Sequence, residues 1–279
     1  MSKNQLIPID VAHLLPALDQ KLLELLRSLS PEEWQRQTIA RLWKVKDVVA
    51  HLLDTNIRVI SLLRDGFFGE QAPLNSYQDL VDFLNQLNAH WVQAMKRVSP
   101  QMLIALHEAT GPTFCDHLRS LDPLGTSTLS VAWAGEEVSL NWMEVAREYT
   151  EKWLHQQQIR DAVNKPGIMT REFFYPFINT LMQALPYTYR HMDAPDGTWV
   201  QMTIATEIGG TWHLQRTGGA WKLTDHPEGK PSSVVITDPD TSWKLFSKSL
   251  RPHQVMDKVT IRGDLRLGET ALSMVSVMA

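Results

Sequence analysis

The spacing of apolar residues changes near residue 196, and this change constrains the fold more than any other feature of the sequence. From about residue 10 to 190, apolar side chains recur every three to four residues, which is the spacing of helices with one buried face. After Asp196-Gly197 they alternate within short segments rich in Val, Ile, Thr and Trp, which is the pattern of strands. The sequence therefore predicts a helical part followed by a small α+β part.

The helical part divides at cap and stop signals. Ser30 can cap a new turn before Pro31, Gly66 ends a helical segment, and Ser99 precedes Pro100. A looser crossover over residues 120–142 contains enough alternation for a short strand or hairpin at residues 128–138. We expect five or six helices, over about residues 10–29, 44–65, 76–98, 100 onward, 148–162 and 170–186.

The second part reads as an antiparallel sheet with two helical stretches. Glycine pairs at 209–210 and 218–219 separate the first strands, as in hairpins. Strands are expected over residues 198–208, 211–217, 220–226, 232–238 and 257–263, and helices over 238–250 and 263–278. A chain of 279 residues suits two domains. We predict a helical bundle over 1–165, a connecting helix over 166–195 and the α+β domain over 196–279.

Composition excludes several classes of protein. Hydrophobic residues make up 43% and charged residues 21%, as in soluble globular proteins. The net charge of -4 comes without a basic stripe, so we expect no nucleic-acid partner. We find no signal peptide and no membrane-length apolar run, and Cys115 is the single cysteine. These features predict a cytoplasmic protein without a membrane partner, in which Cys115 is a packing residue.

The segment EYTEKWLHQQQIRDA, residues 148–162, places Glu151 and His155 one helical turn apart. Two interpretations are open. Glu144, Glu148, Glu151 and His155 form one side of this helix, opposite Trp142, Val145, Tyr149 and Trp153, and such a polar side is typical of a solvated surface. Alternatively the helix is buried on both sides, and Glu151 and His155 are metal ligands facing His51.

His51 lies in the second predicted helix, next to Val48, Leu52 and Thr55 on the helical wheel. A single histidine among apolar neighbours is usually a core residue with a hydrogen-bonding partner. It is also a residue type that three-ligand metal sites favour. The residues alone leave both roles open.

The stretch LWKVKDVVAHLLDTN, with a Trp shortly before an apolar helix that contains His51, resembles the second helix of DinB-like metal-binding four-helix bundles. The whole chain resembles, more narrowly, the mycothiol-dependent maleylpyruvate isomerase family. That family has a C-terminal α+β domain related to sterol carrier proteins, and its usual ending is similar to DKVTIRGDLRLGETALSMVSVMA. The resemblance covers nearly the full length.

This resemblance implies a bacterial enzyme with a divalent metal ion, zinc or alternatively nickel, held by His51, Glu151 and His155. It also implies a low-molecular-weight thiol such as mycothiol as cosubstrate, and a small-molecule substrate that is isomerised or receives the thiol. A monomer or homodimer is expected. The alternative is a non-catalytic protein that binds a metal or an apolar ligand in the sterol-carrier-like domain.

Substrate carboxylates would require a cationic partner, and the planar fork of arginine suits them. Arg58, seven residues after His51, and Arg251, in the second domain, are our candidates. Arg262, Arg266 and His253 are further candidates in the same domain. Asp54 and Asn56 are candidate partners for a metal-bound imidazole.

Overall fold

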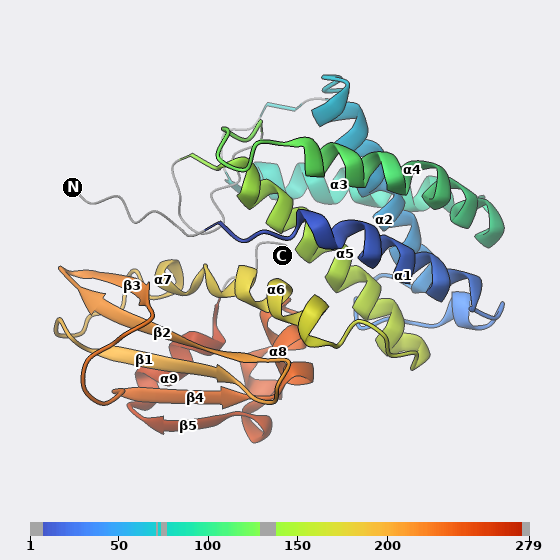
Figure 1. The fold of residues 1–279 in the computed structure, drawn as a ribbon. Helices are drawn as coiled ribbons and strands as arrows, with labels where there is room; N and C mark the ends of the chain where they lie inside the picture. Colours follow the sequence, from blue (N-terminus) through green and yellow to red (C-terminus); the bar gives the residue numbers. More distant parts are fainter. Residues whose placement is uncertain (1–7, 71, 74–76, 129–137, 275–279) are drawn as a thin grey trace. The chain divides into compact units, whose positions relative to one another are not determined.

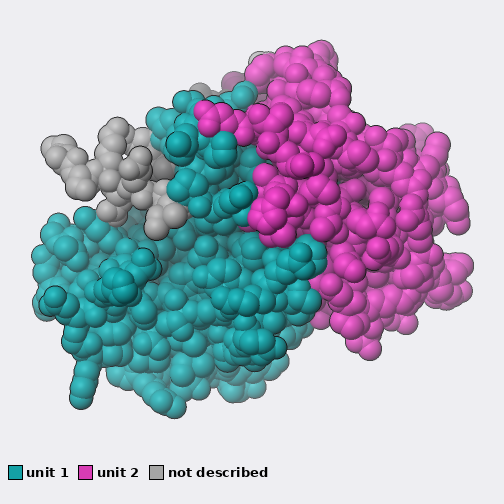
Figure 2. Space-filling model, viewed as in Figure 1, with its two compact units in different colours: residues 1–10, 123–154, 169–279 teal, residues 11–122, 155–168 magenta. Residues whose placement is uncertain are grey.

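The computed structural model describes residues 8–70, 72–73, 77–128 and 138–274. The chain forms two compact units, coloured separately in Figure 2. Unit 1 comprises Met1–Asp10, Pro123–Leu154 and Met169–Ala279, and unit 2 comprises Val11–Asp122 and His155–Ile168. The division passes through one continuous helix, α5 (Asn141–Val163). Each unit combines separate stretches of sequence, whereas the predicted domains are continuous, so the two divisions cannot be compared directly. The predicted boundaries at residues 165 and 195 stay a prediction.

Unit 2 is helical, as the spacing of apolar residues predicted. It contains α1 (Leu15–Arg27), α2 (Val45–Val59), α3 (Tyr77–Met95), α4 (Pro100–Ser120) and the C-terminal part of α5. Helix α2 packs against α3 and α4, and α1 packs against α4 (Figure 1). Short turns precede or extend these helices: η1 (Ala12–Leu14), η2 (Glu33–Gln35) and the π-helical turn η3 (Ile60–Arg64).

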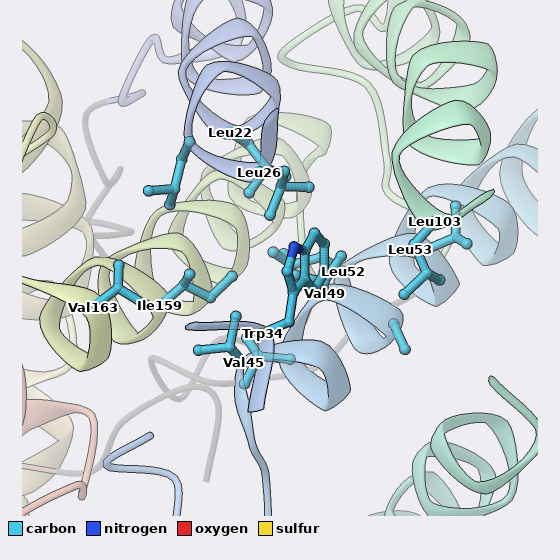
Figure 3. Close-up of a cluster of buried hydrophobic side chains, with 13 residues drawn as sticks. Leu22, Leu26, Trp34, Val45, Val49, Leu52, Leu53, Leu103, Ile159 and Val163 are labelled. Carbon is cyan, nitrogen blue, oxygen red and sulfur yellow. The ribbon is translucent and has the colours of Figure 1, made fainter. Parts of the chain in front are cut away.

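The core of unit 2 surrounds α2, as Figure 3 shows. Its side chains come from α1, η2, α2, α4 and α5, and none is more than 4% exposed. Burying one such side chain stabilises the fold by about 1.5–3 kcal/mol relative to leaving it exposed. The core therefore fixes α2 between its neighbours. Its members are Leu22, Leu25, Leu26, Trp34, Val45, Val48, Val49, Ala50, Leu52, Leu53, Leu103, Ile159 and Val163.

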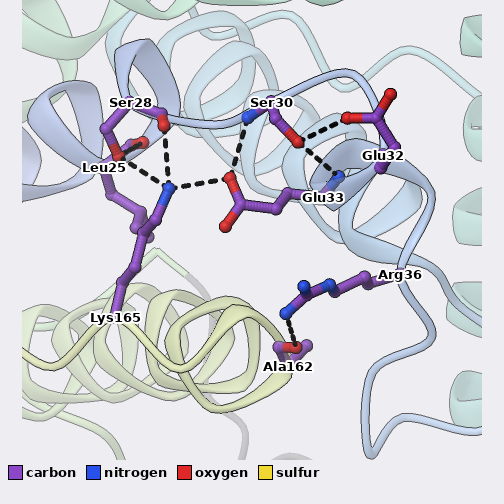
Figure 4. Close-up of polar contacts among 8 residues, drawn as sticks. All are labelled: Leu25, Ser28, Ser30, Glu32, Glu33, Arg36, Ala162 and Lys165. Carbon is purple, nitrogen blue, oxygen red and sulfur yellow. Dashed lines mark hydrogen bonds and ion pairs between the residues drawn. The ribbon is translucent and has the colours of Figure 1, made fainter.

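A polar cluster joins the end of α5 to the loop after α1 (Figure 4). Lys165 Nζ donates to the Ser28 carbonyl at 2.8 Å and to Glu33 Oε2 at 2.7 Å. Glu33 Oε2 also accepts from the Ser30 N–H, and Ser30 Oγ accepts from the Glu33 N–H. This reciprocal pair is a capping box, so Ser30 caps a new turn as the sequence predicted.

Unit 1 contains a five-stranded sheet in the order β3-β2-β1-β4-β5. The strands are β1 (Trp199–Ile204), β2 (Gly210–Thr217), β3 (Ala220–Thr224), β4 (Ser233–Thr237) and β5 (Thr260–Gly263). The prediction of a wholly antiparallel sheet is wrong, because β4 pairs with β1 in parallel. The chain returns after the β1–β2–β3 meander and enters β4 in the direction of β1. Alternation within a strand determines which face is buried, but it does not determine the direction of the neighbouring strand.

The described residues of unit 1 also form α6 (Arg171–Met182), α7 (Leu185–Thr188), α8 (Pro239–Phe246) and α9 (Leu265–Leu272), with short turns η4 (Pro252–Gln254) and η5 (Met256–Lys258). Helix α9 packs on β1, β4 and β5, and α7 packs on β3. The segment predicted as one helix up to Pro186 ends at Met182, and Pro186 lies in the first turn of α7. A proline fits there because the first turn needs no N–H donor.

The α+β class is confirmed, with a helical N-terminal region and a mixed sheet in the C-terminal part. Most of the hairpin predicted for residues 128–138 lies outside the described residues; beside it, Thr126 forms an antiparallel bridge with Leu140. Among the described helices, none has the length and apolar character that a membrane span requires.

Candidate metal centre

Helix α2 places His51 inside unit 2. The helix begins with the Lys44 N–H donating to Asp47 Oδ2 at 3.0 Å, which satisfies one of the N-terminal donors. Helix α2 packs against α3 and α4 through its apolar residues. The His51 residue on this helix is only 5% exposed. The Thr55 hydroxyl donates to the His51 carbonyl at 3.3 Å. His51 therefore lies on a buried segment of α2.

Helix α5 places Glu151 and His155 one turn apart, and it is buried on both sides. Tyr149 and Trp153 are fully buried, and both contact α6. The Tyr149 hydroxyl donates to the Phe173 carbonyl at 2.8 Å, and Trp153 stacks on Phe177 with ring centroids 4.0 Å apart.

The polar side of α5 is buried as well, with His155 9% exposed and Glu151 half-buried. The interpretation of this side as a solvated surface is therefore wrong. Helical periodicity shows two chemically different sides, but it does not show what covers the polar one. Polar residues of α5 that are at most 7% exposed are Glu144, Glu148, Thr150, Lys152, Gln156, Gln157, Gln158 and Arg160.

His51, Glu151 and His155 come together although 100 residues separate the first two. One potential ligand atom from each lies within 4.8 Å of the other two. The His51 and His155 rings meet edge to face, with centroids 4.6 Å apart and planes at 79°. Two imidazole nitrogens and a carboxylate oxygen are a ligand set that Zn²⁺ uses in open, catalytic sites. The donor set therefore fits a divalent ion.

Gln158 orients one of the two imidazoles. Its Oε1 lies 2.9 Å from His155 Nδ1. An amide oxygen accepts, so this contact suits the tautomer with the proton on Nδ1, in which Nε2 keeps its lone pair for a ligand. Sequence reasoning missed Gln158. Its spacing of three residues after His155 was the available signal, since such residues are neighbours on a helix.

Arg147 is a second residue that sequence reasoning missed. Its guanidinium pairs with Glu144 and lies 3.4 Å from Glu148 Oε1, and its side chain is 14% exposed. Burial lowers the pKa of Arg147, but the carboxylates of Glu144, Glu148 and Glu151 outweigh that effect and raise it above its ordinary value. Arg147 is thus a buried cation whose charge interacts with that of Glu151, one of the three clustered residues. The signal was its spacing of three and four residues from Glu144 and Glu151.

The arginines proposed for substrate carboxylates have local partners in the structure. Arg58 Nε pairs with Asp54 Oδ2 at 3.2 Å on α2, and its side chain is 39% exposed. Burial raises the pKa of Asp54, and Arg58 partly opposes this increase. Arg251 belongs to unit 1, where its side chain is exposed. Its backbone N–H donates to Gln254 Oε1 at 2.8 Å. Their role as carboxylate partners stays a prediction.

The other predicted residues have partners of their own. Asn56 Nδ2 donates to Thr110 Oγ1 at 3.0 Å, so this amide contacts α4. Cys115 is 3% exposed, which agrees with a packing role. Arg262 is exposed on β5, and the exposed Arg266 donates to the Asp193 carbonyl at 3.5 Å.

Fold and site together define an α+β protein whose helical part gathers two histidines and a glutamate from α2 and α5. The family model described as the mycothiol maleylpyruvate isomerase N-terminal domain matches residues 15–160. The chain belongs to the mycothiol maleylpyruvate isomerase family. The matched range includes His51, Glu151 and His155.

Two solved structures share the fold. The crystal structure of the mycothiol-dependent maleylpyruvate isomerase is 13% identical, with a TM-score of 0.55, and the match covers 91% of this chain and 92% of that chain. A histidine-to-alanine mutant of the isomerase is 12% identical, with a TM-score of 0.54 and the same coverage. No curated protein sequence matches this chain.

Proposed function

We propose that this protein is a divalent-metal-dependent enzyme that uses a low-molecular-weight thiol to isomerise a small unsaturated acid, or to transfer the thiol to it. The observation that supports the proposal is the cluster of His51, Glu151 and His155 on two buried helices. Membership of the mycothiol maleylpyruvate isomerase family supports the thiol as cosubstrate. We propose zinc as the ion, with nickel as the alternative.

Each residue of the cluster has a defined task in this proposal. The two neutral imidazoles and the Glu151 carboxylate hold the ion, and Gln158 keeps the His155 Nε2 lone pair available. A bound divalent ion would supply positive charge that favours the thiolate form of a thiol. Burial of His51 and His155 keeps bulk water from the ligand atoms.

The isomerisation in this proposal consumes no thiol, whereas the transfer stops at the thiol adduct. The thiolate adds to one carbon of a double bond conjugated with a carbonyl group, which leaves a single bond at which the substrate rotates. Loss of the thiolate then restores the double bond in the trans form. Arg58 and Arg251 are the proposed partners of the substrate carboxylates, because a guanidinium binds a carboxylate through two hydrogen bonds.

Metal content tests the site. Purified wild-type protein should contain one tightly bound divalent ion per chain, and His51→Ala and His155→Ala should lose it. His107→Gln is the matched control, because His107 is also a buried histidine of unit 2 and Gln keeps a donor for the Val49 carbonyl. Equal metal content by elemental analysis in wild type and both alanine variants would refute the site.

The reaction requires a separate test. Metal-loaded protein is assayed with maleylpyruvate in the presence of mycothiol and of other low-molecular-weight thiols, with product isomers and thiol adducts separated by chromatography. We expect turnover that requires both metal and thiol. Formation of the isomer at the same rate without a thiol would contradict the thiol-dependent reaction while leaving the metal site intact.

A further inference from the structure

Residues 37–44 form a short loop that leads directly into α2. An antiparallel bridge between Gln37 and Lys44 closes it. Inside the loop the Trp43 N–H donates to the Ala40 carbonyl at 2.8 Å, and the Thr38 hydroxyl donates to the Trp43 carbonyl at 2.7 Å. The backbone of Trp43 is thus held on both sides of its Cα.

The Gln37 side chain occupies the centre of this loop. Its Nε2 lies within hydrogen-bonding distance of four loop carbonyls, with the shortest contact, 2.9 Å, to Trp43. An amide has two N–H groups, so these carbonyls share its donors. Such a concentration of hydrogen bonds restricts the backbone of the loop and hence the direction of the Trp43 side chain.

The Trp43 ring lies against both imidazoles of the candidate metal centre. Its centroid is 4.7 Å from that of His51, with the planes tilted by 38°, and 6.0 Å from that of His155, with a tilt of 46°. The two imidazoles also touch each other edge to face. Trp43 is itself half-buried, at a position just before the helix that presents His51.

We propose that Trp43 is a positioning residue for the metal centre, held in place by Gln37, which fixes the orientation of both imidazole ligands. This inference rests on the proposed function, since it assumes that the two imidazoles bind an ion. A metal-bound imidazole has more positive charge than a free one, and the face of an indole attracts positive charge. The contact should therefore favour the metal-bound state in addition to fixing the ring orientations.

Metal affinity and ligand geometry test this role without an activity assay. The dissociation constant for Zn²⁺ is measured by competition with a chromophoric chelator, and the absorption spectrum of the Co²⁺-loaded protein reports the ligand geometry. Partners that orient metal ligands typically change metal affinity about 10-fold to 100-fold when mutated. We expect Trp43→Leu to bind Zn²⁺ about tenfold more weakly with an altered Co²⁺ spectrum, and Trp43→Phe, which keeps a ring, to stay within about threefold of wild type.

Trp91→Leu is the matched control. Trp91 is also a half-buried tryptophan that packs on α2, where its Nε1 donates to the Ala50 carbonyl at 2.8 Å. Its loss should leave the Zn²⁺ affinity and the Co²⁺ spectrum unchanged. An equal weakening in Trp91→Leu and Trp43→Leu would refute a specific role for Trp43.

Gln37→Met keeps the proposal testable if Trp43→Leu does not fold. This variant removes the amide donor and leaves the tryptophan in place, so we expect weaker Zn²⁺ binding and a changed Co²⁺ spectrum. If folded Trp43→Leu has the Zn²⁺ affinity and Co²⁺ spectrum of wild type, the inference is overturned. If Trp43→Leu does not fold, the same result in Gln37→Met overturns it. Absence of bound ion in the wild-type protein would instead refute the proposed function.

Discussion

The charged clusters at the two ends of helix α5 differ in how deeply their side chains are buried. Toward the N-terminus, Arg147 pairs with Glu144 and Glu148, and none of these three side chains is more than 14% exposed. Just beyond the C-terminus, Lys165 pairs with Glu33 and a backbone carbonyl while its side chain remains 33% exposed. Buried charges have a large desolvation cost, whereas exposed pairs have little. The comparison therefore predicts that loss of a charged partner lowers stability more in the N-terminal cluster than in the C-terminal one.

Removal of the buried cation should have the largest effect. Arg147→Met leaves the buried carboxylates of Glu144 and Glu148 without that guanidinium, and breaking a buried pair in this way typically costs about 3–5 kcal/mol. We expect a decrease of about 3 kcal/mol or more in the free energy of unfolding, measured by urea denaturation. The control Arg119→Met breaks an exposed pair with Asp116 and should change stability by less than about 0.5 kcal/mol. Similar losses in both variants would contradict the comparison.

Removal of the Glu151 carboxylate should weaken metal binding rather than folding. Glu151→Gln keeps the size of the side chain but removes the charge that attracts a divalent ion, so we expect Zn²⁺ affinity to fall by about 100-fold, or about 2.7 kcal/mol. The measurement is competition with a chelator, with urea denaturation of the metal-free protein as a check on folding. Glu172→Gln, at an exposed position in the first turn of α6, is the control. Wild-type affinity in Glu151→Gln would exclude this residue as a ligand.

The partner of His155 should have a smaller effect on the same measurement. Gln158→Leu removes the oxygen that accepts from Nδ1, so the ring is free to rotate and to exchange tautomers. We expect Zn²⁺ affinity to fall by about tenfold. Gln158→Glu keeps an acceptor and should retain most of the affinity, which separates orientation of the ring from simple packing. Equal weakening in both variants would refute the orienting role.

The features of the fold and of the candidate site differ in how well the sequence predicted them. The change in apolar spacing predicted the helical part and the strands, and the resemblance suggested His51, Glu151 and His155, because residue types and spacings are local. Alternation within strands did not predict the parallel pairing of β1 with β4, and helical periodicity left open whether the polar side of α5 is buried, because both features depend on elements distant in sequence. The ring contacts of Trp43 depend on a loop whose hydrogen bonds involve a single glutamine side chain, and no spacing rule describes such a loop.

The smallest effect is expected at the exposed end of α5, and it should depend on pH. The hydrogen bond from Lys165 and that from the Ser30 N–H lower the pKa of Glu33 below its ordinary value. A carboxyl group with a lowered pKa in the folded state stabilises the fold above its unfolded pKa, which is about 4.3 for glutamate, and loses this contribution as the pH falls through the folded value. Lys165→Met should therefore lower the thermal midpoint slightly at pH 7 and flatten its decline below about pH 4. If scanning calorimetry shows the same acid slope in Lys165→Met as in wild type, Glu33 does not gain its stabilisation from Lys165, and the cluster at this end of α5 is only a surface contact.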